Sequence, residues 1–512
     1  MIRLQPFVSH PASPHARHVL YAAVGALVAI LWTLHAAFMP VVFPVDDAYI
    51  TLHNAAVLVE GADPNYGVSG LVGATSLLHL AMVAAFALVM PAEWALHTVM
   101  WLGVLAYATG ALRLAFVHQA SVSEALLILV AGCLAAEVPH QLMNGLETGW
   151  AMAALVWTMA CASETLDRSR MTAALCGALP LLRPELVVVS GAVFALQAWR
   201  HWRARGAIGA ALPAIIADAG AAMAVVLPFV IALWVATGSP SPGTVNAKRQ
   251  FFAEGCLPAA VKGSWVTANL ISFASLLGAL SAAAALLVIA PLGRAGLLFI
   301  LALLLAYYRE FPGALSHYEH RYLYPILPFL LYGVVSVIRD GRRILRGIAV
   351  AIALASAVVS TWTAPARWQR HSTFLEFTVN ELAAVAEWAR RSIPPASRVL
   401  VHDAGYIAYA TDLPLIDLVG LKTPLSAVEH ARWTWPTCGR SRGQAVHRIA
   451  LAANAEYAIV LRGWNAIFEI VPALRRAGWG VETLRTSRGG YDVFRLTRPR
   501  NSRLPGSRLE QR

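Results

Sequence analysis

The chain has 512 residues, of which 58% are hydrophobic and only 13% are charged. A soluble domain carries about 25% charged residues, so the composition excludes an ordinary soluble protein. The formal net charge is +12, but the basic clusters lie between apolar runs, where the positive-inside rule explains them, and nucleic-acid binding is not expected.

Apolar runs near the length that crosses a bilayer recur from the N-terminus to about residue 363. Transmembrane segments are predicted at 19–42, 71–90, 94–117, 123–137, 147–163, 171–183, 184–200, 207–237, 265–291, 294–311, 322–338 and 345–363. The first is too long for a signal peptide and is expected to be retained. The segment 123–137 is short and is expected to be re-entrant, which leaves about 11 transmembrane helices.

Three basic turns set the predicted orientation of these segments. They are "DRSR" at 167–170, "RHWRARG" at 200–206 and "RDGRRILRG" at 339–347, and together with the N-terminus they are expected in the cytoplasm. Alternation then places the following segments outside: 43–70, 238–264, 312–321 and the chain after about 364.

The pattern of apolar and polar residues changes after residue 364. An amphipathic helix is predicted to end at a Pro-Pro pair, and a short strand follows it. Further strands are predicted at "LPLIDLVG", "AEYAIVLRG" and "YDVFRL", and "IFEIVPALRRAG" reads as a helix with a Gly stop. The predicted fold is a polytopic α-helical membrane protein with a C-terminal extracytoplasmic α/β domain. The predicted divisions are a membrane domain at 1–363 with its first outer loop at 43–70, the α/β domain at 364–498, and a disordered basic tail at 499–512.

The five cysteines divide into two groups. Cys133, Cys161 and Cys176 lie in apolar segments and are expected to be small core residues. Cys256 and Cys438 lie in predicted outer segments, where a disulfide and two unpaired thiols are both open interpretations.

Two adjacent carboxylates, Asp46 and Asp47, follow the first apolar run in "FPVDDAYITLHNAAVLVEG". One interpretation is structural, since Asp is a favoured cap for a helix that starts near Ala48. The other is a general base with a partner that orients it or binds a cation.

Further ionisable residues are expected on the same side of the membrane, where they are functional candidates by default. They are Glu147, Arg183, Glu185, Lys248, Arg249, His317, Glu319, His320 and Arg321. Each alone can be an interfacial anchor or a simple ion pair, such as Arg183 with Glu147. Outward Arg and Lys suit a phosphate, so the set favours a carboxylate base beside a lipid-borne phosphate sugar.

The stretch "VDDAYITLHNAAVLVEGADPNYG" resembles the first outer loop of GT-C type glycosyltransferases. It is most similar to bacterial arabinofuranosyltransferases that add terminal arabinose from a decaprenyl-phosphate donor. Further similarities follow in the same order along most of the chain: "GLET" at 145–148, "LLRPE" at 181–185, "HRYLYPILPFL" at 320–330 and "IDLVGL" at 416–421.

This resemblance implies a GT-C fold and an inverting transfer from a polyprenyl-phosphate sugar. It implies Asp46 as the catalytic base, with Asp47 assisting or binding a divalent cation (Mg, Mn or Ca). Residues on the donor-phosphate side would be Arg183, Lys248, Arg249 and Arg321. Candidate substrate-binding residues are Tyr49, His53, Glu147, Glu185, His317 and His320.

The sequence also departs from the family pattern. Leu52-His53 stands where Arg-Tyr is usual, Lys422-Thr423 replaces an acid, and "DPNYG" replaces a proline-rich segment. These changes leave the identities of the sugar and the acceptor open.

The predicted activity is therefore a glycosyltransferase of cell-wall biogenesis in the cytoplasmic membrane, with its active site facing the periplasm or exterior. Its expected partners are the lipid-linked donor, a glycan, lipid or protein acceptor, and the bilayer. The alternative is a non-enzymatic transporter or assembly subunit for lipid-linked sugars. A transporter favours repeated halves, and the sequence shows no internal repeat.

Overall fold

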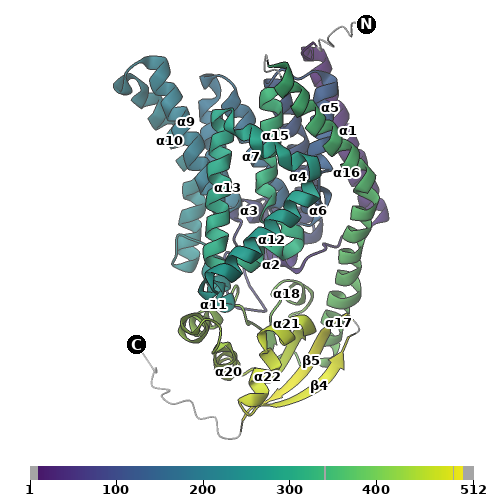
Figure 1. Ribbon diagram of the computed structural model, residues 1–512. Coiled ribbons are helices and arrows are strands. Elements are labelled where there is room, and N and C mark those ends of the chain that lie inside the picture. Colours follow the sequence, from purple (N-terminus) through teal and green to yellow (C-terminus); the bar gives the residue numbers. More distant parts are fainter. Residues whose placement is uncertain (1–9, 339–341, 488, 500–512) are drawn as a thin grey trace.

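Long apolar helices form one part of the molecule, and a small sheet with its own helices lies at one end of them (Figure 1). The computed structural model describes residues 10–338, 342–487 and 489–499. The predicted tail at 499–512 lies outside the described residues except for its first residue.

The helices of the larger part follow one another with short connections. They are α1 (Pro14–Phe38), α2 (Asp46–Glu60), α3 (Leu77–Ala87), α4 (Ala92–Val117), α5 (Val122–Cys133), α6 (Val138–Met143), α7 (Thr148–Ser163), η1 (Leu166–Arg168), α8 (Ser169–Leu182), η2 (Pro184–Leu186), α9 (Val187–Arg205), α10 (Ile208–Thr237), α11 (Thr244–Phe252), η3 (Glu254–Cys256), α12 (Ala259–Leu277), η4 (Gly278–Val288), α13 (Pro291–Glu310), η5 (Pro312–Ser316), α14 (His317–His320), η6 (Tyr324–Ile326), α15 (Leu327–Val337) and α16 (Arg343–Phe377).

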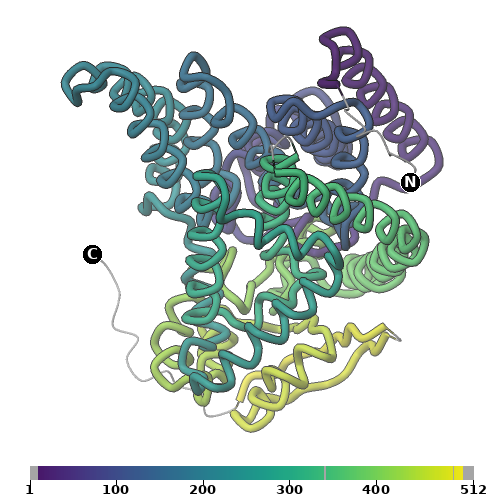
Figure 2. The backbone as a smooth tube through the Cα atoms, turned by 45° about the horizontal axis from the view of Figure 1, so that its top comes forward, coloured from purple at the N-terminus to yellow at the C-terminus, as the bar shows by residue number. Residues whose placement is uncertain are grey.

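Every predicted membrane segment overlaps one or more of these helices, and 265–291, for example, covers part of α12 and all of η4. Within the described residues, six helices are long and apolar enough to cross a membrane, and three further apolar helices are shorter. Two of the long ones, α1 and α10, lie at the margin of the bundle (Figure 2), and only 6% of the apolar window of each is buried. Their exposed apolar faces are suited to lipid, so the chain is a membrane protein, while the number of crossings stays a prediction.

The centre of the bundle is closely packed around α4 and α7. Trp150 and Trp157, two helical turns apart on α7, each donate the indole N–H to a backbone carbonyl of α4 at 2.9 Å. The rings lie over Gly103 and Gly110, where an added Cβ would come within 3.1 and 2.9 Å of them. The glycines therefore let the two helices approach closely.

The last long helix differs from its prediction. The expected segment 345–363 and the amphipathic helix after it are one continuous rod from Arg343 to Ser392, made of α16, the π-helical turn η7 (Thr378–Leu382) and α17 (Ala383–Ser392). The rod includes Pro365 and ends just before the Pro-Pro pair. It joins the bundle directly to the sheet (Figure 1), and the predicted boundary at 363–364 falls inside it.

The sheet has five strands in the order β2-β1-β3-β5-β4. They are β1 (Val399–Val401), β2 (Leu415–Asp417), β3 (Tyr457–Leu461), β4 (Gly480–Thr486) and β5 (Tyr491–Thr497), and β1 pairs in parallel with β2 and β3 while β5 is antiparallel to β3 and β4. The remaining helices are α18 (Tyr406–Ala410), α19 (Pro424–Glu429), η8 (His430–Thr434), η9 (Trp435–Thr437), α20 (Arg442–Ala452), α21 (Arg462–Phe468) and α22 (Ile470–Arg476). We call residues 393–499 the outer domain.

A disulfide fixes the segment after α11 to the outer domain. Cys256 and Cys438 are bonded, with their Cα atoms 5.3 Å apart, so of the two interpretations the structure has the bridge. Beside it, Arg442 donates to the backbone carbonyls of Phe251 and Phe252, each at 3.0 Å. The helix α11 is thereby held between the bundle and the outer domain.

Candidate functional site

Asp46 and Asp47 lie in the first turn of α2 and contact different parts of the chain. The cap residue of α2 is Val45, and neither acid makes the side-chain cap that one interpretation expected. Successive helical residues point about 100° apart. Asp46 therefore faces the outer domain, and Asp47 faces a cavity inside the molecule.

Asp46 is 7% exposed and is held by the outer domain. Its carboxylate accepts the backbone N–H of Gly405 at 3.0 Å and of Tyr406 at 2.7 Å. Burial, together with the nearby charge of Asp403, raises the pKa of Asp46 well above its usual value. This carboxyl group thus links α2 to the loop before α18.

Asp47 pairs with two cations from other parts of the chain. Its Oδ2 lies 3.0 Å from Nη2 of Arg321 and 3.8 Å from Nζ of Lys248. Burial alone would raise the pKa of Asp47, but these positive charges outweigh it and hold the pKa below its usual value. The side chain is 24% exposed, so Asp47 is a charged and accessible group.

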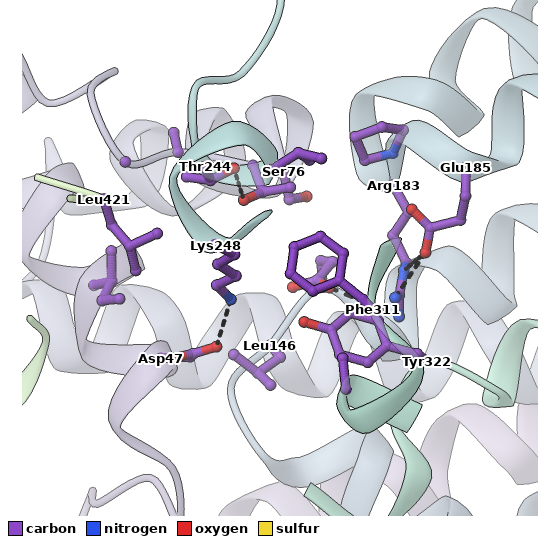
Figure 3. A pocket seen from close by; sticks show the side chains of 18 of the residues that line it. Asp47, Ser76, Leu146, Arg183, Glu185, Thr244, Lys248, Phe311, Tyr322 and Leu421 are labelled. Carbon is purple, nitrogen blue, oxygen red and sulfur yellow. Dashed lines mark hydrogen bonds and ion pairs between the residues drawn. The ribbon is translucent and has the colours of Figure 1, made fainter. Parts of the chain in front are cut away.

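The cavity beside Asp47 has a volume of about 390 Å³. Figure 3 shows Asp47 and Lys248 pointing toward each other on one side of it, and Arg183 with Glu185 on the other. Its ionisable Asp, Glu, Lys and Arg residues are Asp47, Glu147, Arg183, Glu185, Lys248, Arg249, Glu310 and Arg321. The chain therefore brings together seven of the predicted site residues, which come from five separate segments.

Arg183 is placed by the break between two helices. The following Pro184 disfavours helical backbone at position 183, which is extended and ends α8. The guanidinium lies 2.7 Å from Glu185 and 3.9 Å from Glu147 and packs over the ring of Tyr322. It is almost fully buried at the wall of the cavity.

Arg321 follows an unusual turn of the backbone. Tyr318, Glu319 and His320 all have positive φ values, of 44°, 56° and 63°. Left-handed backbone costs about 1–2 kcal/mol for each residue that is not glycine, so surrounding contacts must hold the turn. Gln141 donates to the carbonyl of Tyr318 at 2.8 Å, and the His320 ring nitrogens lie 2.9 Å from a backbone carbonyl and 3.0 Å from the Ser272 hydroxyl.

The helix α11 carries the other two cations. Arg249 lies 2.8 Å from Glu310 and packs over the ring of Trp435 in the outer domain. At the start of the helix, the hydroxyls of Thr75 and Thr244 are 2.8 Å apart. The position of Lys248 therefore depends on contacts with both the bundle and the outer domain.

Six predicted site residues do not line the cavity, and their roles stay predictions. They are Asp46, Tyr49, His53, His317, Glu319 and His320. Tyr49 accepts the N–H of Phe43 at 3.0 Å and packs against Tyr406, and His53 lies 3.0 Å from Asn65. Burial lowers the pKa of His317 to about 4, so this ring is neutral near pH 7.

The cavity also contains polar residues that sequence reasoning missed, chiefly Asn54, Tyr307, Glu310 and Tyr322. Helical spacing could have found Asn54, which is seven residues after Asp47 and shares its face of α2. Behind Asn54 lies Lys422, which is 1% exposed. Its Nζ lies 2.6 Å from Asn54 Oδ1 and 3.6 Å from Asp63 Oδ2, so a second polar contact ties α2 to the outer domain.

The resemblance allows a divalent cation at Asp47. The ion-pair partners of this carboxylate are, however, the cations Lys248 and Arg321. Within the described ranges, no three His, Cys, Asp or Glu side chains are grouped so that they could hold a metal ion. The surroundings of Asp47 do not fit a bound divalent cation.

The fold is similar to that of several solved membrane proteins. ArnT from Cupriavidus metallidurans in the apo state matches with a TM-score of 0.50 and 13% identity, over 93% of this chain and 97% of that one. The apo oligosaccharyltransferase of Archaeoglobus fulgidus matches with a TM-score of 0.46 and 10% identity, over 92% and 74%. The arabinofuranosyltransferase AftD from Mycobacteria matches with a TM-score of 0.47 and 15% identity, over 95% and 42%.

The likeness to ArnT covers nearly all of both chains, and it confirms the GT-C fold that the resemblance predicted. A family model described as "Domain of unknown function (DUF8728)" matches residues 366–496. No curated protein matches the sequence.

Proposed function

Because the chain has the GT-C fold, we propose that it is a glycosyltransferase that uses a polyprenyl-phosphate sugar. One observation carries this proposal: a carboxylate, Asp47, lies within 4 Å of both Arg321 and Lys248 in a cavity of about 390 Å³. Cavities that bind small molecules measure about 300–1,000 Å³, so this cavity is large enough for a phosphate and one sugar ring.

The cations of the cavity suit the donor's phosphate. Arg183 and Arg321 each pack a guanidinium group against the ring of Tyr322, and Lys248 and Arg249 add positive charge from α11. Such groups stabilise the charge that develops on a leaving phosphate. The apolar helices around the cavity would hold the polyprenyl chain.

The proposed step is a single displacement with inversion. The acceptor hydroxyl oxygen forms a bond to the anomeric carbon, and the bond from that carbon to the phosphate oxygen breaks. The phosphate leaves with the electron pair, and the hydroxyl proton passes to a carboxylate. We assign this carboxylate to Asp47, which lines the cavity, and we assign Asp46 a positioning role because both its oxygens accept backbone N–H groups.

The same proposal places the cavity and the outer domain on the periplasmic or exterior side of the cytoplasmic membrane. The basic end of α9, with Arg203 and Arg205, lies at the opposite end of the bundle from the sheet (Figure 1). The positive-inside rule puts that basic end in the cytoplasm. The Cys256–Cys438 bond supports the assignment, since disulfides persist in oxidising compartments.

The experiment is a transfer assay with the purified protein, membrane extract as acceptor, and a panel of labelled polyprenyl-phosphate sugars that includes arabinofuranose. General-base catalysis contributes about 10²–10⁴-fold, so we expect Asp47→Asn to lose at least about 100-fold in turnover. Asp46→Asn is the matched variant one residue away, and it should retain more activity. Turnover by Asp47→Asn at the wild-type rate would refute the base assignment, and donor translocation across vesicles without transfer would favour the transporter.

A further inference from the structure

The cations of the cavity are all occupied by carboxylates. Arg183 pairs with Glu185 at 2.7 Å, and Arg249 pairs with Glu310 at 2.8 Å. The other two, Lys248 and Arg321, share Asp47. An anion that enters the cavity thus meets no Lys or Arg side chain, among those described, that lacks a carboxylate partner.

The pairs differ in how firmly they are held. Arg183 contacts Glu185 through both Nε at 2.8 Å and Nη2 at 2.7 Å, only two residues away in sequence. The Asp47 contacts instead join three separate segments, and the one to Lys248 is long at 3.8 Å. Exchange of partners is therefore easiest at Asp47.

Arg321 also has unused hydrogen-bonding capacity. Its Nη2 donates to the hydroxyl of Tyr322 at 2.8 Å and contacts Asp47. Its Nε and Nη1 are buried, and among the described residues neither has a hydrogen-bond partner. Buried donors of a guanidinium normally have partners, and a phosphate offers several acceptor oxygens in a geometry that a guanidinium matches.

We propose that the donor's phosphate takes Lys248 and Arg321 from Asp47, so that Asp47 accepts the acceptor's proton only in the donor complex. This inference rests on the proposed function and adds that donor binding activates the base. A carboxylate held by two cations is a weak base, and it becomes a stronger one when a phosphate neutralises those cations. The resting enzyme then holds its base in an inactive ion pair.

The exchange also gives the order of events at the cavity. Donor binding moves the cations to the phosphate, and the acceptor oxygen then bonds to the anomeric carbon while its proton passes to Asp47. The leaving polyprenyl phosphate keeps the electron pair and the two cations. Once Asp47 loses its proton to water, its charge again competes for Lys248 and Arg321 and helps to release the product.

The competing explanation is that Asp47 is a permanent brace for Arg321. If Asp47 only positions Arg321, removal of its carboxylate would disorder Arg321 and weaken phosphate binding. If Asp47 competes with the phosphate for Arg321, the same removal would strengthen phosphate binding. The sign of one binding change therefore separates the two explanations.

The test is equilibrium binding of polyprenyl phosphate, which carries no sugar, to the full-length protein in lipid nanodiscs. We expect Asp47→Asn to bind it about tenfold more tightly than the wild type does. Glu60→Gln removes an exposed carboxylate from the other end of α2, away from the cavity, and its affinity should change by no more than about twofold. Inorganic phosphate should show the same order at lower affinity, because it lacks the lipid chain.

Equal or weaker binding by Asp47→Asn overturns the inference alone. No binding of polyprenyl phosphate by the wild type overturns the proposed function as well. If Asp47→Asn does not fold, Asp47→Ser is measured in the same way.

The wild type provides a second measurement. The titratable and charged groups that face Asp47 are its neighbour Asp46, Lys248 from α11, and His317, Tyr318, Arg321 and Tyr322 from the segment before η6. The acid limb of kcat/KM for the donor reports the free enzyme, and that of kcat reports the donor complex. The limb of kcat should lie at the higher pH, and coincidence of the two limbs overturns the inference.

Discussion

Substitution of Gly405 by alanine tests the contact between the outer domain and the paired acids. A Cβ at this position would overlap the backbone oxygen of Asp46 and would lie 2.8 Å from its Oδ2. Both obstacles belong to the start of α2, whose backbone has little room to move. Either the loop before α18 or the first turn of α2 must shift, and the two hydrogen bonds to Asp46 must lengthen.

The expected size of the effect follows from these contacts. Overpacking of a filled site costs about 1–3 kcal/mol, and each hydrogen bond contributes about 0.5–1.5 kcal/mol. Because a shift relieves part of the overlap, we expect the free energy of unfolding to fall by about 2–4 kcal/mol. Turnover should fall by up to about 100-fold, since a displacement of about 1 Å at Asp47 is enough for such a loss.

The assay compares thermal unfolding and donor turnover of the purified variant with those of the wild type. Gly463→Ala in α21 is the matched control, because a Cβ there meets no atom within 4 Å. Alanine favours a helix over glycine by up to about 1 kcal/mol, so the control should be neutral or slightly stabilised. If Gly405→Ala unfolds at the wild-type temperature and turns over donor normally, Asp46 is not held by the outer domain as described.

Three further predictions concern the same region. Cys256→Ser should lower the free energy of unfolding by about 2–5 kcal/mol, and equal migration of oxidised and reduced wild type on a gel would contradict the disulfide. Lys248→Gln removes a charge that lowers the pKa of Asp47, so the acid limb of kcat/KM should move to higher pH by about one unit; a limb that stays in place would count against that pairing. Lys422→Met removes the lysine that lies 3.6 Å from the buried Asp63, which among the described residues keeps only His53 and two backbone N–H groups as partners, and should destabilise by about 3 kcal/mol. Part of the loss should be restored by adding Asp63→Asn, and a double variant no more stable than the single one would argue against the pair.

The positions of the membrane helices could be predicted because the bilayer imposes them. A chain in lipid must satisfy its backbone internally, so long apolar runs become helices whatever their neighbours are. Four strands of the outer domain were likewise visible as short apolar runs. The fifth, β4, was not, because it is an exposed edge strand whose residues include Glu482 and Arg485 and show no regular apolar alternation.

The rod from Arg343 to Ser392 shows a different limit. Its sequence changes from apolar on all sides to amphipathic near residue 364, and that change predicted a break between two domains. A change of pattern indicates a change of surroundings, and a helix can cross such a boundary without interruption. Periodicity thus predicted both parts of the rod but not their continuity.

The candidate site could be predicted only as a set of residues. The sequence places Asp46 and Asp47 side by side. Because neighbouring side chains on a helix point in different directions, Asp46 faces the outer domain and Asp47 faces the cavity. Which acid faces which neighbour depends on how α2 is rotated, and tertiary contacts set that rotation. The partner of Asn54, Lys422, is 368 residues away in sequence and gave no local signal.

Those tertiary contacts make the outer domain part of the site. Asp46 and Lys422 tie α2 to it, and the disulfide at Cys256 ties the end of α11 to it. These two helices carry Asp47 and Lys248, the charged groups whose pairing controls the proposed base. Among its described residues, the outer domain contributes no side chain to the ion pairs of Asp47, yet it holds both helices, α2 and α11. Removal of the outer domain should therefore abolish transfer even though the membrane bundle keeps most of the cavity wall.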